Sequence, residues 1–222
     1  EREDEVAELK RRFKYASHTI TQLKEEHEFL DRLLKAEIPV IAPLKLPGAQ
    51  NESVATSTEG IHFAVFPLVK GRLLDELSVT QLQTLGRYLG RLHGVGKSIQ
   101  KTCRPRLDVD SFGWESLKLL MEADLFETET LEIQYQEAAE RVLEKMQSRF
   151  SRTKFILLHG DCHLGNTLWQ GDHPFFLDFD DLCVAPAVQD IWMIVRGRDE
   201  QAQKDREVLI ASYEQMNEFD FN

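Results

Sequence analysis

The sequence predicts an α+β fold in which helices make up most of the chain and short strands are confined to two stretches. Two observations support this class. Apolar residues recur at three- and four-residue steps before residue 38 and again between residues 78 and 150, which is the spacing of amphipathic helices. Residues 40–69 and 154–178 instead contain short β-branched and aromatic runs bounded by turn residues, which is typical of strands.

The composition is that of a globular protein without nucleic-acid or membrane partners. Of 222 residues 42% are hydrophobic, which is ample for a packed core. Lys and Arg number 27 against 38 Asp and Glu, and the net charge of −11 argues against a surface built to bind phosphate backbones or anionic lipid. No apolar stretch reaches the roughly 18 residues of a membrane span. The segment Glu1–Glu5 does not resemble the start of a secretory signal.

The three cysteines predict reduced thiols. Cys103, Cys162 and Cys183 are odd in number and form no C-x-x-C pair, so a disulfide framework is not indicated. We therefore expect a cytoplasmic protein.

The N-terminal stretch predicts helices that end before Pro39. Residues 6–35 are rich in charge, and Thr19–Gln22 fits the T-x-x-Q capping box, so a second helix is expected to begin there. Apolar residues then recur at near-helical spacing: Ile20, Leu23, Leu30, Leu33 and Leu34. The dipeptide Ile38-Pro39 ends the pattern, because the residue before proline disfavours helix.

A small sheet is expected next, and further helices follow it. The apolar runs Val40–Leu46 and Ile61–Val69 are the candidate strands. Ser78–Gln81 is another capping box, and it precedes leucines at helical spacing. Helices are also predicted over Glu115–Ala123 and Leu131–Phe150. On the latter, one face carries Leu131, Tyr135, Ala138, Val142 and Met146.

The last pattern is a strand, a polar loop and a hairpin. Phe155–Leu158 is followed by polar residues 159–166, then by two short apolar runs on either side of the Gly171-Asp172 turn. We expect His159 to be a hydrogen-bonded structural residue and His93 to cap or pack at the end of its helix. Trp169 and Trp192 are expected in the core.

Carboxylates follow two of these strands directly. Asp161 lies in His159–Asn166 after the first strand, and Asp178 ends the second arm of the hairpin. A strand end fixes the backbone while its loop lets the side chain project into a cleft. We therefore expect Asp161, Asn166 and Asp178 to lie together.

This set of side chains suits phosphoryl transfer. A carboxylate, an amide and a second carboxylate are hard oxygen ligands of the kind that Mg²⁺ prefers when it carries phosphates. One carboxylate is then left to orient a hydroxyl and accept its proton. His159, Asp161 and Asn166 also have the intervals of the kinase catalytic loop H-R-D-x-x-x-x-N.

At these residues the sequence resembles the aminoglycoside phosphotransferase and choline kinase-like branch of the protein-kinase-like fold, whose signature reads H-G-D-x-H-x-x-N before a strand ending in D-F/W-D. Within that branch it is most similar to the bacterial stress response kinase A family of serine/threonine protein kinases. The resemblance covers roughly residues 19–220. It rests on Leu158–Trp169 and on five segments elsewhere, Glu25–Phe29, Ile38–Pro43, Phe63–Pro67, Gly86–His93 and Gln189–Met193.

The resemblance implies a bilobal kinase-like fold and a role for each site residue. A small N-lobe of helices and a small sheet would occupy residues 1–65, and a mainly helical C-lobe residues 66–222. Asp161 would be the catalytic base, with Asp178 as its metal-holding catalytic partner. The implied Mg²⁺ ligands are Asn166, Asp178 and Asp180. The implied ATP-binding residues are Glu26, Phe66, Pro67, Leu68 and Val69. His159 and Asp190 would support the catalytic loop from below.

The implied reaction transfers the γ-phosphoryl group of ATP to a hydroxyl, with Mg²⁺ as the cofactor. The acceptor would be a protein serine or threonine, or alternatively a small-molecule alcohol.

The chain also departs from the family pattern. Residues 1–18 contain no glycine and predict helix, so the phosphate-covering loop is not recognised and the N-lobe is expected to be incomplete. Lys10 and Lys14 are candidates for the phosphate-binding lysine only by proximity to Glu26. The family pattern continues for several helices beyond Asn222, which predicts a truncated C-lobe.

Three other interpretations stay open at this point. The chain could be a pseudokinase that keeps the large lobe without turnover. Phe176–Asp181 resembles the D-x-D strand of haloacid-dehalogenase-like phosphatases, although few residues remain for the rest of that fold. A zinc site at His159, Cys162 and His163 would lack a fourth ligand at a usual spacing.

Overall fold

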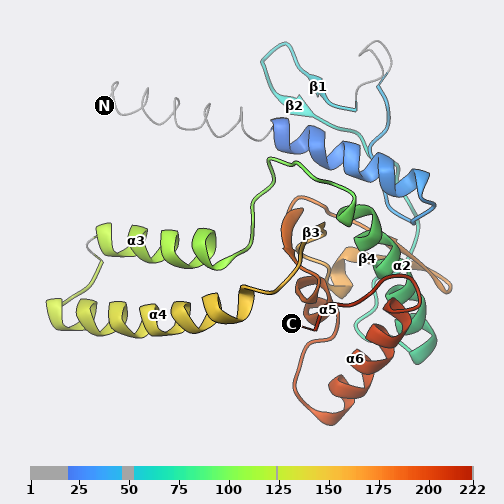
Figure 1. The fold of residues 1–222 in the computed structure, drawn as a ribbon. Helices are drawn as coiled ribbons and strands as arrows, with labels where there is room; N and C mark the ends of the chain where they lie inside the picture. The colour runs from blue at the N-terminus through green and yellow to red at the C-terminus, as the bar shows by residue number, and fades with distance from the viewer. Residues whose placement is uncertain (1–19, 47–52, 124, 222) are drawn as a thin grey trace.

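Helices and short antiparallel sheets occupy separate stretches of the chain, as the α+β class requires. The computed structural model describes residues 20–46, 53–123 and 125–221. Within these residues the strands form three two-stranded antiparallel sheets, β1–β2, β3–β6 and β4–β5. Helices α2 and α6 lie side by side beneath the helix that runs through residues 20–35 (Figure 1). The predicted fold class is confirmed, while the division into lobes at residue 65 stays a prediction.

The 20–35 helix carries one face into the core. Phe29, Leu30 and Leu33 are at most 2% exposed. Its predicted cap, Thr19, lies outside the described residues. The helix ends where predicted, because Glu37 turns the backbone to a φ of 54° and Ile38 follows as a buried residue.

The predicted sheet in residues 40–69 is much smaller than the apolar runs indicated. β1 is Ala55–Thr56, and it pairs with β2, His62–Phe63. Most of Val40–Leu46 has no regular secondary structure, and the run makes a single parallel bridge from Val40 to Phe176. Pro39 and Pro43 have no N–H to donate, so this run cannot form a continuous ladder.

The capping box at Ser78 is confirmed. The Ser78 hydroxyl accepts a hydrogen bond from the Gln81 backbone N–H at 3.3 Å, and Gln81 Oε1 accepts one from the Ser78 N–H at 2.9 Å. α2 follows as Val79–Lys97. Its predicted apolar face is buried, with at most 3% exposure at Leu82, Leu85, Leu89 and Leu92.

Two helices project from the rest as a pair (Figure 1). After a π-helical turn over Asp110–Trp114, α3 spans Glu115–Glu122 and α4 spans Glu129–Phe150. They share a small buried cluster of Val109, Leu117 and Leu143. The predicted apolar face of α4 exists, but its larger side chains are 37–56% exposed at Leu131, Tyr135, Val142 and Met146. No helix of the described residues combines the length and apolarity needed to cross a bilayer.

The strands that follow position two loops next to each other. β3, Phe155–Leu158, pairs with β6, Cys183–Pro186, which the sequence did not predict. The predicted hairpin is confirmed as β4, Thr167–Gln170, with β5, His173–Phe176. The 159–166 loop follows β3, and the 178–182 loop lies between β5 and β6.

Two further helices close the fold. α5 is Val188–Ile194 and α6 is Glu200–Tyr213. Trp169 is core as predicted, at 3% exposure, but Trp192 on α5 is 49% exposed, so that expectation was wrong. The Trp192 indole has a polar role instead, donating a hydrogen bond to Gln189 Oε1 at 3.1 Å.

The approach of α2 to β3 generates a stability prediction. A Cβ at Gly96 would lie 1.8 Å from the Leu157 carbonyl oxygen, whereas a Cβ at Gly94 would meet nothing within 4 Å. We expect Gly96→Ala to lower the free energy of unfolding by at least about 1–3 kcal/mol, because backbone must move. Gly94→Ala, the matched control, should raise it by up to about 1 kcal/mol. Urea unfolding of both variants tests this, and equal stabilities would contradict the packing.

Candidate functional site

The start of the 159–166 loop is held by a buried carboxylate from α5. Asp190 is fully buried, and it accepts hydrogen bonds from the His159 N–H at 3.1 Å and the Gly160 N–H at 2.9 Å. His93 Nε2 donates a third at 2.9 Å. The Tyr213 hydroxyl lies 3.1 Å from His93 Nδ1, so it can donate to that nitrogen in this tautomer. His93 is therefore part of a buried polar network and not a helix cap.

Gly160 lets the two loops approach each other. Its φ is +88°, and a Cβ there would lie 2.1 Å from the Asp181 carbonyl oxygen. Gln189 Nε2 also donates to the Gly160 carbonyl at 3.0 Å. Any other residue would thus strain the backbone and separate the 159–166 loop from the 178–182 loop.

His159 links the same two loops through its ring. Nε2 donates to the Leu177 carbonyl at 2.7 Å, and Nδ1 accepts from the Asp161 N–H at 3.3 Å. The ring also packs on Phe179, with 4.4 Å between ring centroids. Both ring nitrogens are engaged with the backbone, which leaves neither for zinc. The structural role expected for His159 agrees with these contacts.

Asp161 and Asn166 lie together, as the sequence predicted. Asn166, at the end of the 3₁₀ turn Leu164–Asn166, donates from Nδ2 to the Asp161 carbonyl at 3.0 Å and to Asp161 Oδ2 at 3.2 Å. The Asn166 carbonyl accepts from the Leu177 N–H at 3.0 Å, so the residue before Asp178 is attached to the same turn. These bonds occupy the amide nitrogen of Asn166 and leave its side-chain oxygen available.

His163 is a neighbour of Asp161 that sequence reasoning did not select for this chemistry. Its Nε2 lies 3.4 Å from Asp161 Oδ2, and each side chain is 32% exposed. The motif H-G-D-x-H, which places His163 two residues after Asp161, was the sequence signal that could have indicated this contact.

The 178–182 loop carries carboxylates toward a small cavity. Asp178 has a φ of 56°, a conformation that costs a non-glycine residue energy and needs support. The pKa of Asp180 is raised by partial burial and by the charges of Asp178 and Asp181, while Arg104 opposes the shift. The cavity of about 260 Å³ is lined by Glu26, Leu30, Ile41, Phe66 and residues 177–180.

Glu26 is the most perturbed group of this cavity. It is 4% exposed, and its carboxylate forms no ion pair or hydrogen bond within the residues described. Burial, followed by the charge of Asp180, raises its pKa from 4.5 to about 7, although Arg104 opposes this. Lys10 and Lys14 lie outside the described residues, so their pairing with Glu26 stays a prediction.

The structure brings only part of the predicted ATP-binding segment to this cavity. Phe66 lines it, whereas Pro67, Leu68 and Val69 do not. Leu68 is 96% exposed.

The oxygen groups at the site fit Mg²⁺. Among residues 20–46, 53–123 and 125–221, no three His, Cys, Asp or Glu side chains are grouped so as to hold a metal ion by themselves. Mg²⁺ commonly takes one or two carboxylates and completes its shell with phosphate oxygens and water. The free oxygen of Asn166 and the carboxylate of Asp178 match that demand.

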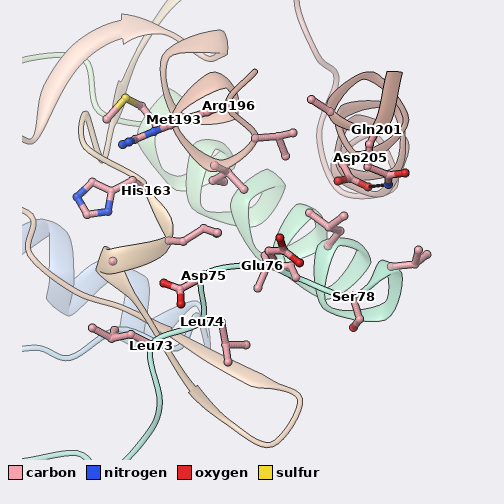
Figure 2. A pocket seen from close by; sticks show the side chains of 18 of the residues that line it. Leu73, Leu74, Asp75, Glu76, Ser78, His163, Met193, Arg196, Gln201 and Asp205 are labelled. Atoms are coloured by element: carbon pink, nitrogen blue, oxygen red, sulfur yellow. Dashed lines mark hydrogen bonds between the residues drawn. The ribbon is translucent and has the colours of Figure 1, made fainter. Parts of the chain in front are cut away.

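A larger cavity of about 880 Å³ is lined in part by residues 163–165 of the 159–166 loop. Figure 2 shows His163 and Met193 at one end, Asp75 and Glu76 from the segment before α2, and Gln201 and Asp205 on α6. Several of these side chains are acidic.

Comparison with known proteins identifies relatives along nearly the whole chain. The sequence model of the phosphotransferase enzyme family matches residues 4–221. Stress response kinase A of Escherichia coli K12 is 36% identical over 203 residues, which are 91% of this chain and 60% of that protein. The serine/threonine protein kinase RdoA of Salmonella typhimurium is also 36% identical over 204 residues. The chain thus spans about three fifths of the length of these relatives.

Solved structures share the fold at lower identity. An amicoumacin kinase in complex with AMP-PNP, Ca²⁺ and Ami superposes with a TM-score of 0.67 at 22% identity, over 90% of this chain and 63% of that one. A microcompartment-associated aminopropanol kinase gives 0.60 at 20% identity, over 92% and 66% of the two chains. The kinase-like fold predicted from the sequence is confirmed.

The raised pKa of Glu26 generates a pH prediction. Because the folded state prefers the protonated form, Glu26 contributes stability below pH 4.5 that is lost as the pH rises to about 7. Glu26→Gln, which resembles the protonated acid, should therefore be more stable than the parent at pH 8, by on the order of 3 kcal/mol. The two proteins should converge at pH 4.5.

Thermal unfolding between pH 4.5 and 8 measures this difference. Glu28→Gln on the exposed face of the same helix is the control and should change little at either pH. If Glu26→Gln were instead less stable than the parent at pH 8, the charge of the Glu26 carboxylate would have to be compensated by a favourable partner, and the prediction would be wrong.

Proposed function

Because the chain belongs to the phosphotransferase enzyme family, we propose that it transfers the γ-phosphoryl group of ATP to a hydroxyl, most specifically that of a protein serine or threonine. The observation that carries this proposal is the hydrogen-bonded pair of Asp161 and Asn166, joined through the Asn166 carbonyl to the backbone next to Asp178. An acid, an amide and a second acid on two fixed loops are the groups that this chemistry needs.

Asp161 is the proposed base. Its side chain is partly exposed between the two loops, and Asn166 orients one of its oxygens at 3.2 Å. As the acceptor oxygen bonds to the γ-phosphorus, its proton passes to Asp161 and the bond from phosphorus to the β–γ bridging oxygen breaks, releasing ADP. His163, 3.4 Å from the same carboxylate, would help to keep Asp161 turned toward the cleft.

Asn166 and Asp178 are the proposed holders of Mg²⁺, and Asp180 is proposed to assist a second ion. Bound Mg²⁺ would neutralise charge on the phosphate oxygens during transfer. The chain's part is to present two oxygen groups from loops whose backbones are already bonded to each other, so little ordering remains when nucleotide binds.

The cavity behind Asp178 is the proposed adenine side of the site. Leu30, Ile41 and Phe66 give it apolar lining, and Glu26 adds a buried carboxyl group. The exposed segment from Phe66 to Val69 is proposed as the hinge that meets the nucleotide. Support comes from the AMP-PNP complex of the amicoumacin kinase.

The larger cavity is the proposed entry for the acceptor, because His163 to Gly165 of the Asp161 loop form part of its wall. A protein acceptor is supported by the name of the serine/threonine kinase relative, and a small alcohol by the aminopropanol kinase. We propose a cytoplasmic location, where ATP is supplied. The unpaired thiols of Cys103, Cys162 and Cys183 are compatible with it.

A second candidate is nucleotide binding without turnover. Its supporting observation is Glu26, a buried carboxylate with no cation bound to it among the described residues. The family match favours either kinase reading over the phosphatase alternative.

Replacing the base should separate chemistry from binding. We expect Asp161→Asn to lower phosphoryl transfer by about 10²- to 10⁴-fold, because proton acceptance is lost. Nucleotide affinity should stay within a few-fold. The assay follows labelled phosphate from ATP to serine/threonine peptides and to amino alcohols, with calorimetry for ATP. Turnover equal to that of the parent would exclude Asp161 as the base, and no transfer by the parent to any acceptor favours the second candidate.

Removing a metal ligand should abolish stabilisation by Mg·ATP. A ligand at one hundred times its dissociation constant stabilises the folded state by roughly 2.7 kcal/mol, which thermal unfolding detects. We expect this shift in the parent chain and in Asp172→Asn, a control in the exposed β4–β5 turn. Asp178→Asn should lose most of it. An undiminished shift in Asp178→Asn would contradict the metal role.

A further inference from the structure

Arg104 is a buried cation that neither the sequence patterns nor the proposed mechanism uses. It is 8% exposed. It lies between α2 and α3, in a segment without a recognised motif. Burying a guanidinium is costly unless its donors are satisfied, so its partners indicate what it does.

Those partners are backbone carbonyls, and most belong to the 178–182 loop. Nε donates to the Leu182 carbonyl at 2.6 Å, and Nη2 donates to the carbonyls of Asp180 and, at 3.5 Å, Phe179. Nη1 lies 3.5 Å from the Gln22 carbonyl on the 20–35 helix. One planar group thus spans the loop that carries Asp178 and Asp180.

The segment that carries Arg104 is fixed on both sides. Before it, the Thr102 hydroxyl donates to Glu25 Oε2 at 2.5 Å and the Cys103 N–H to Glu25 Oε1 at 3.0 Å. After it, the Val184 N–H donates to the Pro105 carbonyl at 2.8 Å, so the chain continues along β6. The backbone that carries Arg104 is therefore held in place by hydrogen bonds on both sides.

The loop needs such support. Asp178 has a positive φ, and its charge lies close to those of Asp180 and Glu26. Burial first, and then the charges of the neighbouring carboxylates, raise the pKa of Glu26 and of Asp180, and the charge of Arg104 opposes both shifts.

We propose that Arg104 is a positioning residue for the metal ion: its guanidinium holds the 178–182 backbone so that Asp178 is presented in a binding conformation before any metal arrives. This inference rests on the proposed function. It assigns Arg104 no contact with substrate.

Two substitutions test the proposal. Arg104→Met removes charge and donors but keeps the apolar stem, and Arg104→Lys keeps the charge without the planar fork that reaches several carbonyls. Arg106→Met is the matched control, because Arg106 pairs with Asp108 at 2.7 Å and stacks on Phe155 without contacting the loop.

The first measurement is hydrogen exchange of residues 177–184 in the unliganded proteins, which needs no activity. We expect faster exchange there in Arg104→Met and Arg104→Lys than in the parent or Arg106→Met, with unchanged exchange in α2. Parent-like exchange in both Arg104 variants would overturn the proposal.

The second measurement is the Mg²⁺ concentration that gives half-maximal ATP binding. Loss of a group supporting a metal ligand typically costs about 10- to 100-fold in metal affinity, so we expect at least about a tenfold increase for Arg104→Met. Metal-free ATP binding should change less than about threefold. Arg104→Lys should recover only part of the loss, and full recovery would mean that charge alone suffices and would overturn positioning by the fork.

The control arms separate the two proposals. If the parent binds ATP in a Mg²⁺-dependent way and Arg104→Met does the same with equal affinity, this inference fails and the proposed function stands. If the parent shows no Mg²⁺-dependent binding at all, the proposed function fails and the inference falls with it.

Discussion

The site depends first on the buried carboxylate of Asp190. An anion removed from water is tolerated only when donors surround it, and Asp190 has three: the N–H groups of His159 and Gly160 and the ring of His93. These donors come from the end of β3 and from α2, while the acid lies on α5. Removing one partner from such a group costs about 3–5 kcal/mol, so the three elements are held in one arrangement.

A second buried charge, the guanidinium of Arg104, holds the 178–182 loop as Asp190 holds the 159–166 loop. Asp190 accepts from backbone N–H groups of the 159–166 loop, and Arg104 donates to backbone carbonyls of the 178–182 loop. His159 joins the two loops through the Leu177 carbonyl. The groups proposed for chemistry, Asp161 and Asp178, therefore sit on backbones fixed by charged hydrogen bonds, so their own carboxylates are not needed to hold the loops in place.

Much of the site was predictable because its residues are close in sequence. Asp161 and Asn166 precede β4 and Asp178 follows β5, so the short hairpin that these strands form brings the three residues together, and its alternation and turn residues are visible in the sequence. The capping box fixed the start of α2 for the same local reason. The roles of His93 and Arg104 could not be predicted this way. Their partners lie 75 or more residues away, and the partners of Arg104 are carbonyls, which every residue carries.

The spacing of apolar residues predicts amphipathic helices, but it does not show which apolar helix faces are buried against other elements. The stripe on α2 is buried against α6 and the strands, while an equally regular stripe on α4 is exposed within the described chain. The apolar runs of residues 40–69 form less sheet than their composition predicts, because proline residues in and beside them have no backbone N–H to donate to a ladder.

The charges of the cavity connect stability to ligand binding. Glu26, Asp178 and Asp180 lie near one another with Arg104 as the nearby cation, and burial together with these neighbouring charges disfavours the ionised form of Glu26 and raises its pKa. A bound divalent ion or a lysine would relieve the repulsion between these carboxylates, and relief adds to the affinity for whichever cation enters. The carboxylates that repel one another in this cavity therefore favour a metal-bound phosphate there, since a site neutralised by its own side chains would gain less from Mg²⁺.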